Sequence, residues 1–265
     1  MYADVVVVQP HSVGMERDIE FIRQGLVQLG YKHIVHKPVD KRAAQVLAGE
    51  VSERIEVKEN AMRFHVDVLK GQKTGFFIDQ RDNRALIQRY AKGKRVLNAF
   101  SYSGGFSVAA ALAGAVEVHS LDASASALSL AKENAVLNGL VEKHRTIKQD
   151  AVKYLSSMTD RYDLIVLDPP AFAKHKSARH QAIQAYKRIN LAALEQLEPG
   201  GVLFTFSCSQ VIDELLFKNT VASAAMAANF HVQLLHRMRQ PADHPVHLSH
   251  PEGEYLKGLV LRKLG

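Results

Sequence analysis

The sequence contains one cysteine, Cys208, which lies just beyond the apolar run 202–206 and between Ser207 and Ser209. A cysteine thiolate is a nucleophile that can form a covalent intermediate with a substrate. The competing interpretation is an inert thiol in an apolar core, because cysteine is among the most buried residue types. The position at the end of a predicted strand, beside two serines and no aliphatic residue, favours the nucleophile.

Glycines and carboxylates stand at the same kind of position after other apolar runs. Gly104 and Gly105 follow one run, and Asp122 and Asp150 end the next two. Ligands of open α/β sheets bind at the carboxyl ends of the strands, where glycines admit the ligand and a helix amino end favours a carboxylate. The aspartates could accept hydrogen bonds from ribose hydroxyls and an adenine amino group. The combination predicts an adenosyl ligand, although each aspartate could instead cap a helix and the glycines could form only a tight turn.

Strand and helix patterns alternate from Arg95 onward, which predicts an α/β fold with a mostly parallel, doubly wound sheet. We expect two further strands near the end of the chain. They are joined directly, so they form an antiparallel hairpin that closes the sheet. The expected strands are 95–99, 117–121, 144–148, 163–167, 202–206, 231–238 and 255–261. A helix is expected to stop at Pro199-Gly200-Gly201, and another to span 213–228.

The first 70 residues are too few and too mixed to join that sheet. They predict a separate small α/β domain over 1–70, with a boundary near Gly71 and the larger domain over 71–265. The expected strands of the small domain are 5–8, 33–36, 54–57 and 62–68, and the expected helices are 17–29 and 41–48.

Composition sets broad limits on partners and location. The chain has 265 residues, a formal net charge of +7 and a single cysteine. The charge is compatible with a polyanionic partner, because clustered Lys and Arg release counterions from phosphates. No apolar stretch approaches the roughly 18 residues of a membrane helix, so we expect a cytoplasmic protein without a membrane partner. His244, His247 and His250 lack further ligands at zinc spacing, so no metal site is expected.

Two motifs carry a family resemblance. The runs 168–174 (DPPAFAK) and 207–209 (SCS) resemble those of the bacterial ribosomal RNA large-subunit methyltransferases that make 5-methylcytosine. The similarity covers nearly the whole chain and includes 71–81 (GQKTGFFIDQR), 97–106 (LNAFSYSGGF), 243–245 (DHP) and 249–259 (SHPEGEYLKGL). It implies a Rossmann-like class I methyltransferase fold, S-adenosylmethionine as the cofactor and RNA, specifically ribosomal RNA, as the partner. Members usually begin with an RNA-binding domain of the PUA type. This chain starts at what resembles their middle module, so we expect a fragment or a short variant.

The resemblance implies roles for the residues around Cys208. Carbon 5 of cytosine is a poor nucleophile, so its methylation requires prior attack of a thiolate at carbon 6. Cys208 would form this adduct, and Asp168 would hydrogen-bond or protonate the pyrimidine edge. Phe172 could stack on an extruded base, or it could simply pack in the core.

The remaining expected contacts lie at the strand ends. Arg81 is favoured over Arg84 for the methionine carboxylate or an RNA phosphate. The cofactor is expected to contact Arg81, Phe100, Ser101, Tyr102, Ser103, Gly104, Asp122, Ala123, Ser124, Gln149, Asp150, Ala151, Asp168 and Pro169. The substrate is expected to contact Pro170, Phe172, Lys174, Lys176 and Arg179.

Other functions stay open at this point. The run beginning Asp168-Pro169-Pro170 also resembles the signature of enzymes that methylate exocyclic amines of RNA or DNA, which need no cysteine. A non-catalytic RNA-binding adaptor that keeps the fold is a second alternative. A nicotinamide-dependent dehydrogenase is disfavoured, because the G-x-G-x-x-G fingerprint is absent. The sequence also leaves a homodimer open.

Overall fold

The computed structural model describes residues 1–40, 42–173 and 175–264. It divides into two compact units, Met1–Ile78 and Asp79–Gly265. The first unit therefore extends past the boundary predicted near Gly71. The reason is local packing, because Phe76 is buried and its carbonyl accepts a 3.0 Å hydrogen bond from the Tyr2 hydroxyl. The same hydroxyl lies 2.7 Å from Thr74 Oγ1.

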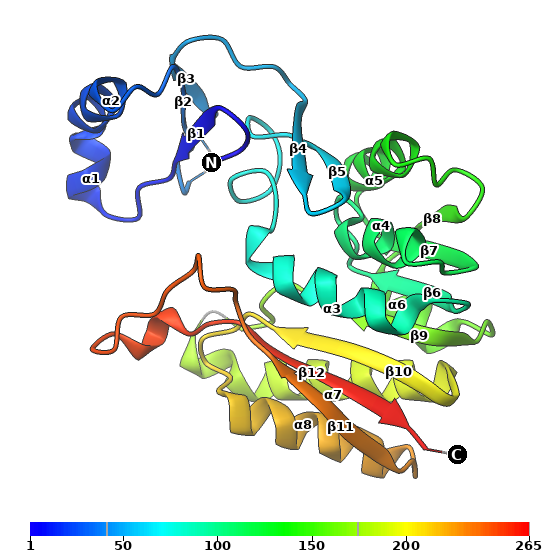
Figure 1. Cartoon of the computed structure of the whole chain (residues 1–265). Coiled ribbons are helices and arrows are strands. Elements are labelled where there is room, and N and C mark those ends of the chain that lie inside the picture. Colours follow the sequence, from blue (N-terminus) through cyan, green and yellow to red (C-terminus); the bar gives the residue numbers. More distant parts are fainter. Residues whose placement is uncertain (41, 174, 265) are drawn as a thin grey trace. The chain divides into compact units, whose positions relative to one another are not determined.

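The first unit is built from two small sheets and two short helices (Figure 1). In one sheet β2 (His33–His36) pairs in parallel with β1 (Val5–Val8) and antiparallel with β3 (Gln45–Ala48). The other sheet is the hairpin of β4 (Ile55–Glu59) and β5 (Met62–Val66). The helices are α1 (Val13–Arg17) and α2 (Ile19–Gln28).

Two expectations for this unit were wrong. The helix expected over 41–48 is not formed, since 45–48 is strand β3 and Lys41 lies outside the described residues. The strand provides hydrogen-bond partners for the edge of β2, where Ile34 and Val35 are fully buried, and buried backbone groups require such partners. The helix expected over 17–29 is two helices, because Asp18 leaves the helical conformation between them.

The second unit contains the seven-stranded sheet, with the order β11-β12-β10-β9-β6-β7-β8 (Figure 1). Its parallel strands are β6 (Arg95–Ala99), β7 (Glu117–Asp122), β8 (His144–Lys148), β9 (Tyr162–Leu167) and β10 (Leu197–Ser207). Strand β12 (Lys257–Lys263) lies antiparallel between β10 and β11 (Val232–Met238). The predicted parallel sheet with an antiparallel terminal hairpin is thus confirmed.

The helices of the second unit form two groups. In one group α3 (Arg81–Ala91) contacts α4 (Gly105–Leu112), which contacts α5 (Ala125–Leu137). In the other, α7 (Arg179–Gln196) contacts both α6 (Ala151–Ser157) and α8 (Glu214–Ala227). Figure 1 shows α7 and α8 along one face of the sheet and α3 on the opposite face. Short 3-10 helices occur at η1 (Ile78–Gln80), η2 (Lys176–Ala178) and η3 (Pro251–Gly253).

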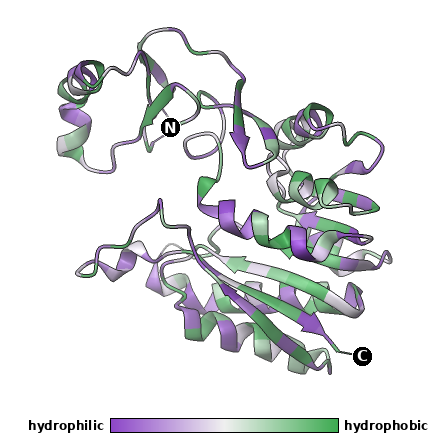
Figure 2. Ribbon diagram, viewed as in Figure 1, coloured by the Kyte–Doolittle hydropathy of each residue, from purple (hydrophilic) through white to green (hydrophobic). Residues whose placement is uncertain are grey.

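The core of the second unit lies between the sheet and its helices. Leu97, Ile165 and Leu203 from neighbouring strands are fully buried and join one cluster with Ile189 of α7 and Phe217 of α8. The inner parallel strands β6, β9 and β10 are covered on both faces, which explains their largely apolar sequences, whereas the edge strand β8 is mostly exposed. Figure 2 shows this as strands that are mainly hydrophobic between helices of mixed character.

The sequence Pro199-Gly200-Gly201 does not end a helix directly. Helix α7 already stops at Gln196, and the three residues lie within β10, where the pairing with β9 shifts between Leu197 and Val202. A Cβ atom at Gly201 would lie 2.8 Å from the Glu198 carbonyl oxygen. The glycine is therefore required by a close backbone approach in an irregular strand.

The sheet topology brings several chain segments to one edge. Strands β6 to β10 run in parallel, so their carboxyl ends share this edge. Strand β12 runs the other way, and its first residue, Lys257, pairs with Ser207 at the end of β10. The loop between β11 and β12 is consequently at the same edge as the segments that follow the parallel strands.

Candidate active site

The loop after β6 has an unusual backbone. Phe100, Tyr102 and Gly104 have φ angles of 59°, 44° and 77°, a region that non-glycine residues seldom occupy. A Cβ atom at Gly104 would lie 3.0 Å from Ala131 Cβ, and one at Gly105 would lie 3.1 Å from Arg84 Cδ. The glycine pair therefore allows α4 to begin in a tight turn. Residues held in sparsely populated conformations cluster at ligand sites.

Asp122 connects this loop to the end of β7. Its Oδ2 accepts a hydrogen bond from Tyr102 N, and its Oδ1 accepts one from Ser124 N, both at 2.9 Å. The cap of α5 is Ser124, whose Oγ accepts from Ala127 N at 3.2 Å. The half-buried Asp122 carboxylate is thus fixed in orientation, and its oxygens have further lone pairs for ribose hydroxyls.

Asp150, in contrast, is the N-cap of α6. Its side chain is exposed and accepts a 2.9 Å hydrogen bond from Lys153 N. The helix-cap role considered for this residue is present, and contact with adenine stays a prediction.

Ser101 provides an independent indication of a ligand. Its hydroxyl is buried in the loop after β6, and no described residue is its hydrogen-bond partner. Leaving a buried hydroxyl unsatisfied costs about 1–3 kcal/mol, and a bound polar ligand would supply the missing bond. This residue type and position fit an adenosyl cofactor.

The two arginines of α3 have different surroundings. Arg81 pairs with Asp82 at 3.1 Å and also with Asp243 in the loop between β11 and β12. Arg84 is only 2% exposed and lies against Gly105. The structure thus places Arg84 nearer than expected to the glycine pair, while a role of Arg81 in cofactor binding stays a prediction.

Cys208 and the residues after β9 come together at the carboxyl edge. Cys208 is half-buried, and its Sγ lies 4.0 Å from the carbonyl oxygen of Pro169. Ser209 Oγ donates a 2.7 Å hydrogen bond to the Ala173 carbonyl, which holds the loop 168–173 against the end of β10. Asp168 is half-buried and begins that loop, so the structure brings together the two residues predicted to be catalytic.

Tyr186 of α7 supports both sides of this arrangement. Its hydroxyl accepts a 2.9 Å hydrogen bond from Ser207 Oγ, and its ring packs edge-on against Phe172 at 4.8 Å between centroids. Burial raises the pKa of Tyr186 above its usual range. Phe172 is half-buried in this contact, which agrees with the alternative that it packs in the core. Its stacking on a base stays a prediction.

Three residues of the site were not predicted from the sequence. Lys257 is buried and donates 2.7 Å hydrogen bonds to the carbonyls of Ser209 and Tyr255. Tyr255 in turn donates its hydroxyl to Asp79 Oδ2 at 2.7 Å, and burial raises the pKa of this phenol. All three lie in segments that match family motifs, but those motifs alone did not indicate a buried ammonium group.

The predicted substrate contacts lie mostly on the surface. Pro170, Lys176 and Arg179 are exposed, and Arg179 forms a 3.4 Å ion pair with Asp213. Lys174 lies outside the described residues. Exposed cations at the start of α7 can contact phosphates without further rearrangement.

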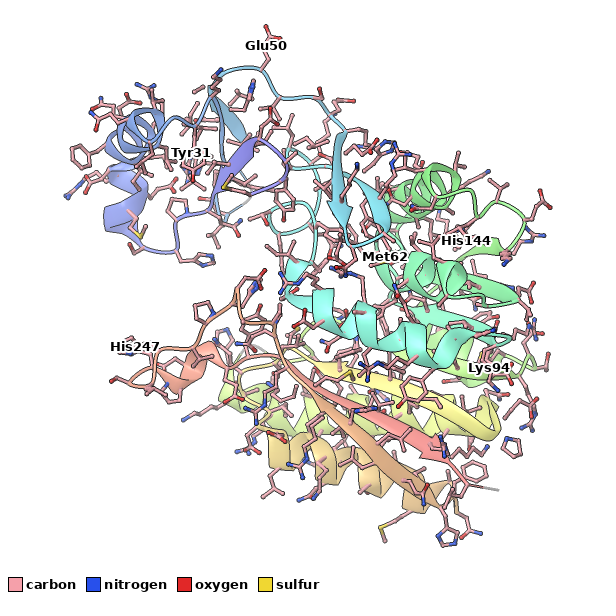
Figure 3. The ribbon with its side chains drawn as sticks, viewed as in Figure 1. Tyr31, Glu50, Met62, Lys94, His144 and His247 are labelled. Carbon is pink, nitrogen blue, oxygen red and sulfur yellow. The ribbon has the colours of Figure 1, made fainter. Side chains whose placement is uncertain are left out.

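The histidine-rich loop after β11 extends from the same edge, and Figure 3 labels His247 in it. The rings of His247 and His250 lie 5.3 Å apart. In the part of the chain that the structure describes, no three His, Cys, Asp or Glu side chains gather to hold a metal ion. A search of the described helices also finds none long and apolar enough to cross a membrane.

Comparison with known proteins identifies the family. Residues 25–262 match the model of the S-adenosylmethionine-dependent methyltransferases. A ribosomal RNA large subunit methyltransferase I from Shewanella denitrificans is 44% identical over 98% of this chain and 69% of its own. One from Tolumonas auensis is 50% identical over 83% of this chain and 57% of its own. The chain therefore belongs to the S-adenosylmethionine-dependent methyltransferases and, among them, to the ribosomal RNA large subunit methyltransferase I family.

Solved structures agree with this assignment. A chain from Streptococcus mutans assigned as a SAM-dependent methyltransferase superposes with a TM-score of 0.87 at 25% identity, covering 98% of this chain and 69% of that one. SMU.776, solved in complex with SAH, gives a TM-score of 0.88 at 26% identity, covering 98% of this chain and 70% of its own. The protein is a methyltransferase, and S-adenosylmethionine is its cofactor.

Proposed function

We propose that this protein methylates carbon 5 of a cytosine in large-subunit ribosomal RNA through a covalent adduct of Cys208. The observation that carries the proposal is the position of the Cys208 thiol at the carboxyl edge, with Sγ 4.0 Å from the carbonyl oxygen of Pro169, the residue that follows Asp168. The relatives named ribosomal RNA large subunit methyltransferase I support ribosomal RNA as the substrate. A formal net charge of +7 is compatible with that polyanion.

The chemistry requires an activated pyrimidine. The Cys208 thiolate attacks carbon 6 and forms a carbon–sulfur bond, and the electron pair of the 5,6 double bond makes carbon 5 nucleophilic. S-adenosylmethionine would supply the electrophilic methyl group and leave as S-adenosylhomocysteine. Loss of the proton of carbon 5 to water then returns the electron pair of that carbon–hydrogen bond to the 5,6 double bond, and the carbon–sulfur bond breaks so that Cys208 departs as a thiolate.

Asp168 would orient the base in this reaction. Its half-buried carboxyl begins the loop that Ser209 holds against β10. A carboxyl group there can hydrogen-bond the N3 and amino edge of cytosine as charge develops on the ring. Phe172 would stack on the extruded base.

The cofactor would lie over the segments after β6, β7 and β8. Asp122, already fixed by two backbone N–H groups, would accept from the ribose hydroxyls. The buried Ser101 hydroxyl would gain a partner, and Asp150 would accept from the adenine amino group. The other predicted cofactor contacts, Arg81 included, keep their proposed roles.

Contacts to RNA would come from the exposed start of α7. Lys176 and Arg179 lie there beside the catalytic loop. Phosphate contacts fix the position of an RNA without reading its sequence. The first unit would add further contacts.

Substitution of Cys208 tests the proposal. Cys208→Ala and Cys208→Ser should both reduce methyl transfer to large-subunit ribosomal RNA below detection, because neither side chain forms the adduct. Calorimetry should find that both variants bind S-adenosylmethionine as the wild type does. Retained turnover in either variant would rule out the covalent route and favour direct transfer to an exocyclic amine.

A further inference from the structure

Strand β12 carries a buried lysine at each end. Lys257 is 7% exposed and Lys263 is 3% exposed. Lys263 donates hydrogen bonds of 2.8 and 2.7 Å to the carbonyls of Leu194 and Leu197. Lys257 makes the same kind of contact, with both of its 2.7 Å bonds going to backbone carbonyls. Their hydrogen bonding is matched, but only Lys257 stands at the carboxyl edge.

Lys257 is bonded to and paired with the residues on either side of Cys208. Ser209, whose carbonyl binds the ammonium group, is the next residue after Cys208, and Lys257 pairs with Ser207 across the two strands. Neither hydrogen-bond partner of the ammonium group is a carboxylate. A buried cation with no carboxylate bonded to it is costly, and a thiolate at Cys208 would add a compensating negative charge.

We propose that Lys257 is a positioning residue that stabilises the thiolate form of Cys208. The inference rests on the proposed role of Cys208 as the nucleophile. The thiolate is the reactive form of a cysteine, and a neighbouring lysine is one of the groups known to favour it. The same ammonium group holds the Ser209 carbonyl, so it fixes the segment that carries the thiol.

The electrostatic effects on Lys257 agree with this geometry. Burial lowers the pKa of Lys257, whereas the interaction with Cys208 raises it, with smaller contributions from Asp213 and Glu254. For Lys263, burial also lowers the pKa, but the interacting charges are Arg161, Glu198 and Glu195. The two lysines thus differ in their interacting groups, because a thiol acts on Lys257 and only charged side chains act on Lys263.

Other titratable groups face this part of the site. Tyr186 of α7 and Tyr255 both interact with Cys208, and burial raises the pKa of each phenol, so both stay neutral at physiological pH. Asp168 begins the loop whose Pro169 carbonyl lies near Sγ, and Asp79 accepts from Tyr255. The carboxylate of Asp168 would oppose a thiolate, which makes a compensating cation more important.

The pH dependence of Cys208 alkylation tests the inference directly. Because Cys208 is the only cysteine, the intact mass of the full chain after treatment with iodoacetamide reports on this thiol alone. The Lys257→Gln variant keeps an N–H donor for the carbonyls but removes the charge. Its alkylation midpoint should rise by about one pH unit, with a roughly tenfold slower reaction below the midpoint. Lys257→Arg should restore a midpoint close to that of the wild type.

Two controls separate charge from structure. Lys263→Gln removes the matched buried charge at the other end of β12 and should leave the midpoint unchanged. Ser209→Ala loosens the same loop without a change of charge and should also leave it unchanged. An unchanged midpoint in Lys257→Gln, or an equal shift in Lys263→Gln, would overturn the inference.

The wild type provides a test that needs no variant. Its alkylation midpoint should lie below the value of about 8.5 that is usual for a cysteine, and a midpoint at or above this value would contradict the inference. A failure of this inference can be distinguished from a failure of the proposed function. The alkylation experiment involves no methyl transfer, and turnover by Cys208→Ala would disprove the adduct whatever the midpoint is.

Discussion

The two edges of the large sheet use charged side chains differently. At the amino edge, Arg95 at the start of β6 pairs with Glu117 at 2.8 Å and with Asp160 at 3.3 Å. At the carboxyl edge, Asp122 and Lys257 instead bond to backbone groups of the neighbouring loops. Arg95 and its acidic partners thus join opposite charges, whereas Asp122 and Lys257 hold loop backbone in shape, as Lys263 also does at the amino edge.

This difference has a functional consequence. A charge that is paired with an opposite charge is partly compensated, so it attracts a further ligand less strongly than an unpaired charge would. A charge that is bonded to backbone groups is held in place and can still interact with a ligand or a reactive group. Arg95 and its acidic partners therefore serve the fold, whereas Asp122 and Lys257 stand where they can also serve the site.

The largest effect is expected at the amino edge, on stability in acid. His144, at the start of β8, shares a 2.7 Å hydrogen bond with Ser120 Oγ, and burial lowers its pKa to about 4. The unfolded chain binds a proton near pH 6.5, so stability falls as the pH drops from 6.5 toward 4, by about 3 kcal/mol in total. In thermal melts, the melting temperature of the wild type should fall more steeply with decreasing pH across this window than that of His144→Gln. Equal slopes of melting temperature against pH would contradict the assignment. The exposed His231→Gln variant serves as the control.

The next effect is expected at the carboxyl edge, on cofactor affinity. Asp122→Ala removes the acceptor of Tyr102 N and Ser124 N, together with the proposed ribose contact. Calorimetry should record at least a roughly tenfold weaker binding of S-adenosylmethionine, since a hydrogen bond to a charged group contributes about 1.5–3 kcal/mol. Undiminished affinity would show that Asp122 serves the loop alone.

The smallest effect is expected at the other end of the same strand. Glu117→Gln breaks the pair with Arg95 and weakens the 3.0 Å contact with His119, but the carboxyl group is partly exposed. The loss should be about 0.5 kcal/mol in urea unfolding, because solvent screens such pairs. Cofactor affinity should stay at the wild-type value. A loss of affinity comparable with that of Asp122→Ala would remove the distinction between the two edges.

Much of the fold could be predicted because its strands are buried on both faces. The run 95–99 coincides with β6, where four of the five residues are buried. The run 144–148 coincides with β8, although this edge strand is mostly exposed. Strand β3 could not be predicted in this way. Its first residues, Gln45 and Val46, are exposed, so it forms through backbone pairing with β2 rather than through an apolar pattern.

The site could be predicted where position alone defines it. Cys208, Asp168 and Asp122 follow strands, and the sheet brings strand ends together. The burial of Arg84 and Lys257 could not be predicted, because long cationic side chains are usually exposed. Their burial results from tertiary packing, of Arg84 against Gly105 and of Lys257 against the end of β10.

The covalent adduct is the central claim, and trapping it is the most direct test. In RNA that contains 5-fluorocytidine, fluorine replaces the proton that must leave carbon 5, so the enzyme cannot be released after methyl transfer. Incubation with S-adenosylmethionine and a large-subunit ribosomal RNA transcript of this kind should give a covalent complex whose RNA remnant maps to Cys208 by mass spectrometry. Methylation of the unmodified transcript, without any covalent complex on the fluorinated one, would contradict the account.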